Sequence, residues 1–267
     1  PNQCIFCLWP QAMHGTRYRL RSPKNVVDEI EYDIKLCPQV LKGGEFFFED
    51  DTFTVDKNRA MCICDEILKR ELKIAFSVNA RVDSYDDHMF ALMKKAGCRE
   101  LLVGFESADQ GILNKVHKNI TVAQMYEFMN TAKKYDLEVH GCFVFGLPGE
   151  TKETIQKTTD LALALGLTTV QFSAAVPFPG TSYYELCKEK GWLKSCDWRD
   201  WLLEGEQASV VEYENLSSKE INRSVDAALK KFYLRPIYLF NFIFKNRSFV
   251  DLYRKLRGGL NFFSYLF

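Results

Sequence analysis

The sequence predicts an α/β fold, a partial (β/α)6 TIM-like barrel with its first strand truncated and a helical C-terminal region. Apolar strand-like segments recur at roughly thirty-residue intervals, and helical segments lie between them, which is typical of parallel βα units. The 267 residues are 47% hydrophobic, enough for one barrel-sized core. Polar residues gather where the predicted strands end, and βα barrels carry their chemistry at the carboxyl ends of the strands.

Five strands are expected within the chain, and a sixth is expected before Pro1. Their residue ranges are 45–49, 74–81, 101–105, 139–145 and 169–172. Helical periodicity and N-cap residues predict helices between them, at about 23–34, 56–70, 85–95, 121–135 and 152–165. From about residue 183 the pattern changes to helices and tryptophan-rich irregular segments. We therefore expect a barrel core over residues 1–182 and a helical C-terminal extension over 183–267.

Composition and charge exclude several classes of partner. Thirty-five basic residues balance 35 acidic residues, so no electrostatic case exists for nucleic acid or for a bulk acidic partner. Nine scattered cysteines do not form a disulfide framework and favour a reducing, cytoplasmic setting. No segment reaches the roughly 20 apolar residues that span a bilayer. The aromatic and basic tail, residues 232–267, leaves a peripheral membrane contact open beside ordinary helix packing.

The first ten residues carry two cysteines, Cys4 and Cys7, with Phe6 between them. If a third cysteine stood just upstream of Pro1, the loop would read C-x-x-x-C-x-x-C. Three thiolates on so short a loop can hold three irons of a 4Fe-4S cluster and leave the fourth iron open. A thioredoxin-like motif would instead open a helix, which Pro10 prevents, and zinc would ordinarily need a second ligand pair.

The other cysteines give no second ligand pair. Cys62 and Cys64 lie two apart on a predicted helix, so they point to different faces and cannot chelate together. The remaining cysteines are expected to be small buried hydrophobic residues: Cys37, Cys98, Cys142, Cys187 and Cys196.

Several segments resemble, in order, the cobalamin-dependent branch of the radical S-adenosylmethionine (radical SAM) enzymes. The resemblance covers approximately residues 1–193, and its landmarks are the cysteine loop and residues 48–53, 79–83, 104–107, 145–151 and 177–181. Residues 8–11 and 232–236 look most like the radical SAM proteins of hopanoid biosynthesis.

This resemblance implies an activity and a set of cofactors. The cofactors would be a 4Fe-4S cluster, S-adenosylmethionine (SAM) and cobalamin, the last held by a domain that this chain does not contain. SAM would be cleaved reductively to a 5′-deoxyadenosyl radical, for cobalamin-associated methylation or rearrangement of a lipid or natural-product intermediate of the hopanoid type. A reductase or flavodoxin would supply the electron.

The resemblance also implies roles near the amino group and carboxylate of SAM. Phe6 would pack near the adenine. The SAM ammonium needs an acidic acceptor, for which we expect Glu49, Asp50 or Asp51, because the family-like Gly43-Gly44-Glu45 precedes the strand instead of ending it. The SAM carboxylate needs a cation, and Arg81 could supply it by charge-assisted hydrogen bonds.

Strand alternation and the family pattern add further candidates. Ser77 and Asn79 share the face of Arg81, for which a salt bridge with Asp83 or Glu106 is the alternative. Glu106 could accept from both ribose hydroxyls or could be a rim residue. Gly146, Leu147 and Pro148 approximate the glycine-rich segment that cradles adenine, although Cys142 stands where a glycine is expected.

Substrate contacts are expected on the last two strands, and no catalytic residue is assigned beyond the cluster ligands. Gln171 and Ser173 are two apart, so both side chains can face the lumen. His140 faces either the cavity or the helices, and alternation alone leaves this open.

Three alternatives remain beside the radical SAM hypothesis. An RNA-modifying methylthiotransferase would share the barrel but should carry a basic appendage, which the balanced charge disfavours. A non-catalytic iron-sulfur or zinc binding module would have no use for Arg81 and Glu106. Finally, the chain as cut could be inert, with only two cysteines to hold a cluster.

Overall fold

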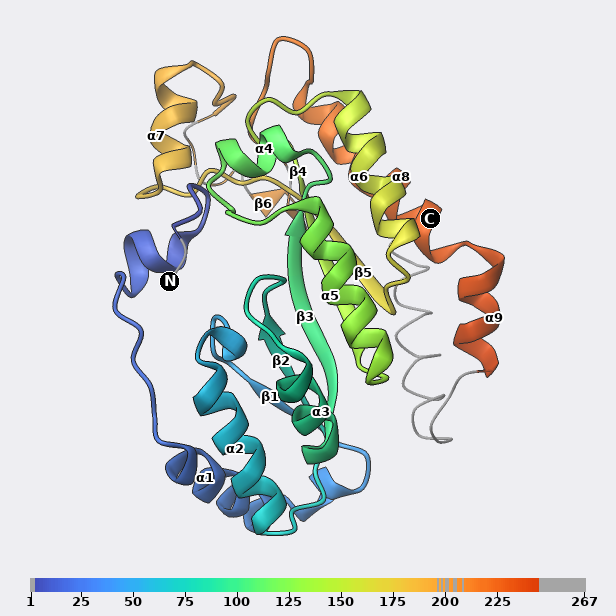
Figure 1. Ribbon diagram of the computed structural model, residues 1–267. Helices are drawn as coiled ribbons and strands as arrows, with labels where there is room; N and C mark the ends of the chain where they lie inside the picture. Colours follow the sequence, from blue (N-terminus) through green and yellow to red (C-terminus); the bar gives the residue numbers. More distant parts are fainter. Residues whose placement is uncertain are drawn as a thin grey trace.

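The sheet consists of five parallel strands joined in chain order. The computed structural model describes residues 3–195, 197, 199, 202–203, 206–207 and 209–244. The strands pair in the order β1-β2-β3-β4-β5 (Figure 1). Their bounds are β1 (Phe46–Phe48), β2 (Phe76–Ala80), β3 (Cys98–Glu106), β4 (Glu138–Phe145) and β5 (Thr169–Ala174). All five predicted strands are confirmed, and they form a partial barrel.

Helices follow the strands as predicted. The connecting helices are α1 (Pro23–Leu36), α2 (Lys57–Lys69), α3 (Asp87–Ala96), α5 (Val122–Lys134) and α6 (Lys152–Ala164). Each begins after a residue whose side chain accepts a hydrogen bond from the first turn, which stabilises the helix start: Ser22, Asp56, Asp86, Thr121 and Thr151. The sequence did not predict four short helical segments: η1 (Trp9–Met13), η2 (Pro38–Leu41), η3 (Phe53–Val55) and α4 (Gln110–Lys115).

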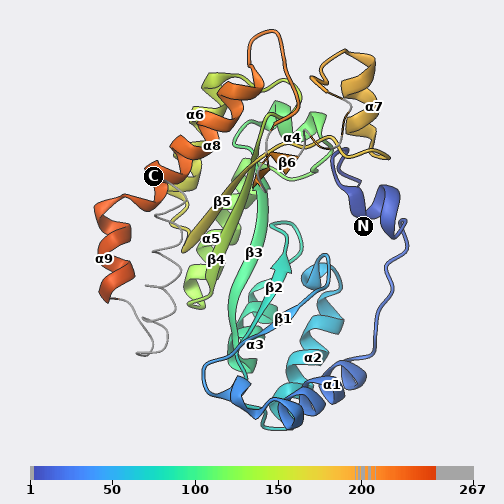
Figure 2. The same cartoon turned by 180° about the vertical axis from the view of Figure 1, so that it is seen from behind.

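The two faces of the sheet differ in burial. Along β4, Val139, Gly141, Phe143 and Phe145 are buried, whereas the alternate residues are half-buried. Figures 1 and 2 show the helices that follow the strands along one face of the sheet. The buried side chains of β4 belong to the main core cluster with residues of these helices. The opposite face of the strands is therefore the less buried lumen face.

The region after residue 182 is mainly helical, as predicted. It comprises α7 (Ser182–Glu189), a short antiparallel pair of β6 (Leu202–Leu203) and β7 (Glu206–Gln207), α8 (Ser218–Tyr233) and α9 (Pro236–Phe244). The sequence did not predict the β6-β7 pair. Helix α8 packs along β5 and α6. The Tyr233 hydroxyl donates to the Val170 carbonyl at 2.6 Å and accepts from its N–H at 2.9 Å. The domain boundary at residue 182 stays a prediction.

The structure describes only the first part of the aromatic and basic tail, residues 232–267. Residues 245–267 lie outside the described residues. Within the described part of the chain, no helix is long and apolar enough to cross a membrane.

The cysteines outside the first loop follow the prediction only in part. Cys62 is exposed and Cys64 is buried, so the pair does point to different faces. Cys98 and Cys187 are buried as expected. Cys37 was expected to be buried and is exposed, because it caps the surface end of α1. Cys142 is half-buried on the lumen face of β4, and Cys196 lies outside the described residues.

Candidate active site

One glutamine side chain organises the cysteine loop. The Gln11 amide nitrogen lies 3.0, 3.0 and 2.9 Å from the carbonyl oxygens of Cys4, Ile5 and Cys7. Its amide oxygen accepts from the backbone N–H and the hydroxyl of Ser182 at 2.7 and 2.8 Å. A single residue thus fixes the backbone of the loop and ties it to the start of α7.

A second anchor is the segment after α4, where three consecutive carbonyls accept hydrogen bonds from the site. Val116 accepts from the Ile5 N–H at 3.1 Å, and His117 accepts from the Cys4 thiol at 3.6 Å. Lys118 accepts from the Arg81 guanidinium at 3.0 Å. His117 has a φ of 55°, in the left-handed region. The segment, residues 116–118, joins the cysteine loop to the end of β2.

Glu106 and Lys118 form a buried ion pair beside Cys4. The carboxylate and ammonium are 2.6 Å apart, and their side chains are only 8% and 9% exposed. The pairing register shifts between Gly104 and Glu106, where Glu106 has a φ of 64°. A Cβ atom on Gly104 would lie 2.3 Å from the Glu106 carboxylate oxygen. The bulge and the glycine together let the pair fold back over the strand.

Arg81 forms the salt bridge that the sequence left as an alternative. Its Nε and a terminal nitrogen donate to the two carboxylate oxygens of Asp83 at 2.9 and 2.8 Å. Burial raises the pKa of the Cys4 thiol, and the positive charges of Lys118 and Arg81 oppose this increase. Burial also raises the pKa of the Cys7 thiol. The cations would therefore favour thiolate at Cys4 once a metal replaces the proton.

These groups share a cavity of about 520 Å³ at the carboxyl ends of β1 to β3. It brings together eight of the predicted site residues: Cys4, Phe6, Cys7, Glu49, Asp51, Asn79, Arg81 and Glu106. Lys118, which the sequence analysis did not single out, lines the same cavity. Thiols, carboxylates and cations therefore meet in one place, as the chelation of an amino acid at an iron site requires.

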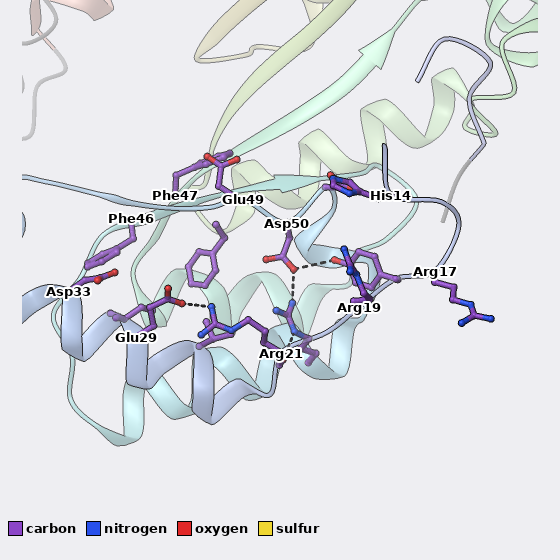
Figure 3. A pocket seen from close by; sticks show the side chains of 16 residues that line it. His14, Arg17, Arg19, Arg21, Glu29, Asp33, Phe46, Phe47, Glu49 and Asp50 are labelled. Atoms are coloured by element: carbon purple, nitrogen blue, oxygen red, sulfur yellow. Dashed lines mark hydrogen bonds and ion pairs between the residues drawn. The ribbon is translucent and has the colours of Figure 1, made fainter. Parts of the chain in front are cut away.

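Asp50 faces a neighbouring cavity, also of about 520 Å³, instead of the cysteine cavity. Its carboxylate accepts from the Arg59 guanidinium at 2.9 Å and from the Tyr18 hydroxyl at 3.2 Å (Figure 3). Glu45 lies at the other end of β1, where it accepts from Arg99 at 2.7 Å. Of the predicted carboxylates, Glu49 and Asp51 are thus the two that face the cysteines.

The loop after β4 packs against the C-terminal region. The Gly146 and Leu147 N–H groups donate to the Glu150 carboxylate, and two tyrosine hydroxyls, of Tyr183 and Tyr213, donate to the Gly146 carbonyl. Burial raises the pKa of Glu150 to about 8. Its second carboxylate oxygen finds no partner among the described residues. Pro148 lines a separate cavity. An adenine-binding role for this loop stays a prediction.

The proposed substrate residues lie on the lumen face of the sheet. His140 pairs in register with Leu102, and Gln171 is in register with Cys142, which is itself opposite Gly104. Leu102 and Gly104 line the cysteine cavity, and neighbours in register share a face. His140 therefore faces the lumen, which the sequence left open.

A short polar row crosses this face. The His140 Nδ1 is 2.8 Å from the Thr169 hydroxyl, and the Gln171 amide donates to Ser173 at 3.1 Å. Burial lowers the pKa of His140. Ser77 is buried on β2 and does not belong to the lining of the cysteine cavity. The substrate roles of His140, Gln171 and Ser173, and the cofactor role of Ser77, remain predictions.

Comparison with known proteins identifies the family. Residues 1–162 match the radical SAM superfamily. The chain belongs to this superfamily. Membership implies a 4Fe-4S cluster and SAM as cofactors. Among the described residues, no group of three histidine, cysteine or acidic side chains is placed to hold a metal ion. Cys4 and Cys7 supply two thiols of the donor set, and the third ligand upstream of Pro1 stays a prediction.

The relatives of this radical SAM chain include several methyltransferases. An uncharacterized methyltransferase of Pyrococcus horikoshii is 33% identical over 265 residues, which are 97% of this chain and 55% of the relative. Bacteriochlorophyllide d C-12(1)-methyltransferase of Chlorobaculum tepidum is 27% identical over 74% of this chain and 42% of that protein. The chain thus spans between 30% and 55% of the length of these curated relatives.

Other relatives and one solved structure complete the comparison. The anaerobic magnesium-protoporphyrin IX monomethyl ester cyclase of Rubrivivax gelatinosus is 29% identical over 71% of this chain and 34% of that protein. The hopanoid C-3 methylase of Methylococcus capsulatus is 22% identical over 68% of this chain and 33% of that protein. The cobalamin-dependent radical enzyme OxsB superposes with a TM-score of 0.67 at 16% identity, over 96% of this chain and 43% of that one. This likeness shows the shared fold.

Proposed function

We propose that this chain is the SAM-cleaving core of a cobalamin-associated radical SAM methyltransferase that acts on a small molecule. The observation that carries the proposal is the cysteine cavity, in which two thiols lie with strand-end carboxylates and buried cations. The methyltransferase names of several relatives support methyl transfer, and the cobalamin-dependent solved relative supports cobalamin, carried elsewhere in the whole protein.

The residues of the cavity fit the cluster and SAM. Cys4 and Cys7 would bind the cluster, which when bound supplies the electron that cleaves SAM into methionine and a 5′-deoxyadenosyl radical. Glu49 and Asp51 line the cavity, and no ion pair of either carboxylate is found in the described part of the chain, so they are available to the SAM ammonium. Arg81 and Lys118 line the cavity as well, and they would bind the SAM carboxylate.

The walls of the cavity would hold SAM in place and exclude water. Glu106 is fixed by Lys118 at the end of β3, where its second oxygen can accept from a ribose hydroxyl. Phe6 presents an aromatic ring beside the thiols. The row of His140, Gln171 and Ser173, of which Gln171 is exposed and the other two are half-buried, continues along the lumen face and would contact the substrate.

The decisive experiment follows SAM cleavage in a chain extended upstream of Pro1 to include the predicted third cysteine. After anaerobic reconstitution with iron and sulfide, SAM and dithionite are added and 5′-deoxyadenosine is measured by chromatography. We expect product that is lost in Cys4→Ala and Cys7→Ala and retained in Cys62→Ala, an exposed cysteine on α2. A cluster that assembles but never cleaves SAM would favour the non-catalytic binding module instead.

We consider two hypotheses for the class of the substrate. The resemblance to hopanoid-biosynthesis proteins suggests a lipid, whereas the names of other relatives point to tetrapyrroles. Methyl transfer from added methylcobalamin to a hopanoid or to a porphyrin, followed by mass spectrometry, separates the two. 5′-Deoxyadenosine formation with a rearranged product and no added methyl group would replace methylation by rearrangement.

For the C-terminal region we propose a peripheral membrane contact. On α9, Ile237 and Phe240 are 62% and 57% exposed. Phe232 is buried, so a truncation before it would damage the core. The suitable test compares flotation of the full chain and of an Ile237→Ser/Phe240→Ser variant with anionic liposomes. Equal recovery of the two proteins would remove the membrane hypothesis.

A further inference from the structure

Two aromatic rings at the mouth of the cysteine cavity have no task in SAM cleavage as proposed. The Trp9 indole and the His14 imidazole are stacked, with centroids 5.2 Å apart and planes 5° from parallel. Both side chains line the cavity. Trp9 is 48% exposed, so part of its ring surface is open to a ligand.

The stacked pair is held rigidly relative to the cysteines. Trp9 and His14 bracket η1, which is closed by a 2.8 Å hydrogen bond from the His14 N–H to the Trp9 carbonyl. Gln11 lies in the same turn, and its amide makes the contacts to the cysteine loop and to Ser182 described above. An exposed aromatic surface that is fixed in this way loses little conformational entropy when a flat ring stacks on it.

An exposed cation borders the same cavity as the rings. Arg17 lines the cysteine cavity and is exposed. The neighbouring guanidinium groups are committed, that of Arg21 to Glu29 and that of Arg59 to Asp50. For Arg17 no ion pair is found within the described residues, and Figure 3 shows its guanidinium directed away from the Asp50 contacts. It is therefore available to an anion that approaches this side of the cavity.

We propose that Trp9, His14 and Arg17 form the outer part of the substrate site of the proposed methyltransferase, and that they select a planar conjugated ring bearing a carboxylate. A flat π-system gains from stacking on the rings, and its carboxylate gains from Arg17. A saturated, puckered polycycle without an anionic group gains neither. This inference rests on the proposed function, because the ligand is a substrate only if the chain is a methyltransferase. Binding of the ligand requires no SAM cleavage and can be measured separately.

The test measures binding of protoporphyrin IX to the full 267-residue chain by porphyrin fluorescence, without iron, sulfide or SAM. Trp9→Leu should weaken binding about three- to tenfold, the range of an aromatic stacking contact. Arg17→Gln should weaken it about two- to fivefold, and this effect should vanish for the dimethyl ester, which lacks the carboxylates. Tyr32→Leu and Arg19→Gln are the matched controls, an exposed tyrosine on α1 and an arginine that lines only the Asp50 cavity.

The outcomes separate the site from its alternatives. Equal binding by the wild type and Trp9→Leu, or equal weakening in Tyr32→Leu, would overturn the proposal, because the porphyrin would then adhere unspecifically. The proposal would also be overturned if hydroxocobalamin displaced the porphyrin from the wild type but not from Trp9→Leu, because the rings would then bind the cofactor instead of the substrate. Porphyrin binding that survives in a chain unable to cleave SAM would leave the ring site standing and remove only the proposed function.

Discussion

The two ends of the sheet are both densely charged, but they use their charges differently. At the amino end, the Arg99 guanidinium lies 2.7 Å from Glu45, 2.6 Å from Glu138 and 3.1 Å from Glu100. At the carboxyl end, Glu106 and Lys118 pair with each other inside a cavity wall that also carries thiols and two further carboxylates. The carboxylates at the first end gather around one guanidinium, whereas the charges at the second end face a space that can hold a ligand.

This difference shows that charge density alone does not identify a site. Three acidic side chains surround Arg99, yet they take up its donors and border none of the cavities described above. Glu49 and Asp51 border the cysteine cavity and retain their acceptors. The following predictions test the contrast, from the largest expected effect to the smallest.

Lys118→Met should destabilise the protein by about 3 to 5 kcal/mol, because it leaves the Glu106 carboxylate buried without its partner. Urea unfolding measures the free energy. Lys157→Met is the matched control, since its pair with Asp109 is more than half exposed on the lysine side and should contribute less than about 1 kcal/mol. Equal losses in the two variants would contradict the buried pair.

Glu150 should make stability depend on pH. Its pKa in the folded protein is raised by burial to about 8, so the folded state holds a proton that the unfolded state releases near pH 4 to 5. Stability is therefore full below that range and falls as the pH rises towards 8, by at most about 1.4 kcal/mol per pH unit. Glu150→Gln should flatten this decline in urea unfolding between pH 5 and 8. The exposed Glu153→Gln should leave it unchanged, and an unaltered slope in Glu150→Gln would refute the assignment.

Gly104→Ala should cost about 1 to 3 kcal/mol, the range for overpacking. The new methyl group would stand 2.3 Å from Glu106 and 2.9 Å from Lys118, and the ion pair would have to shift. SAM binding, measured by calorimetry on the reconstituted chain, should weaken as well. Gly111→Ala in α4 meets only a side-chain oxygen at 3.0 Å and serves as the control. Normal SAM affinity in Gly104→Ala would mean that the Glu106–Lys118 pair does not contribute to SAM binding.

Arg99→Met should have the smallest effect, about 1 to 2 kcal/mol, because its network is partly exposed. The remaining carboxylates would repel one another, so the loss should shrink as the pH falls towards 4. SAM cleavage should stay at the wild-type level once folding is allowed for. A specific loss of cleavage would mean that the two ends of the sheet are coupled.

Much of the fold was predictable from local patterns. Alternation of apolar and polar residues over 74–81 indicated β2, and N-cap residues such as Thr121 and Thr151 marked the helix starts within a residue. These signals are contained in a few neighbouring residues, so a single sequence reveals them. The pair β6-β7 has two residues in each strand and leaves no comparable period.

The candidate site was predictable where its residues follow strands and unpredictable where loops meet. The cysteine loop, Glu49 and Arg81 stand at strand ends or in a spaced motif. Lys118 pairs with Glu106 across a helix and a loop, and Gln11 binds Ser182, which is 171 residues away. Gln11 also binds backbone carbonyls, which carry no sequence signature. The left-handed Asn119 and the Asp109 cap of α4 are the signals that could have drawn attention to this segment.

The hydroxyl of Tyr233 protects part of an edge strand of the sheet. It occupies both the N–H and the C=O of Val170 on β5, the last strand of the sheet. Terminal strands with unpaired backbone groups are where a second copy can add a strand and start aggregation. One phenol from α8 takes up the groups that such an addition would use at this residue. Protection of this strand against such an addition therefore rests in part on a single phenol oxygen.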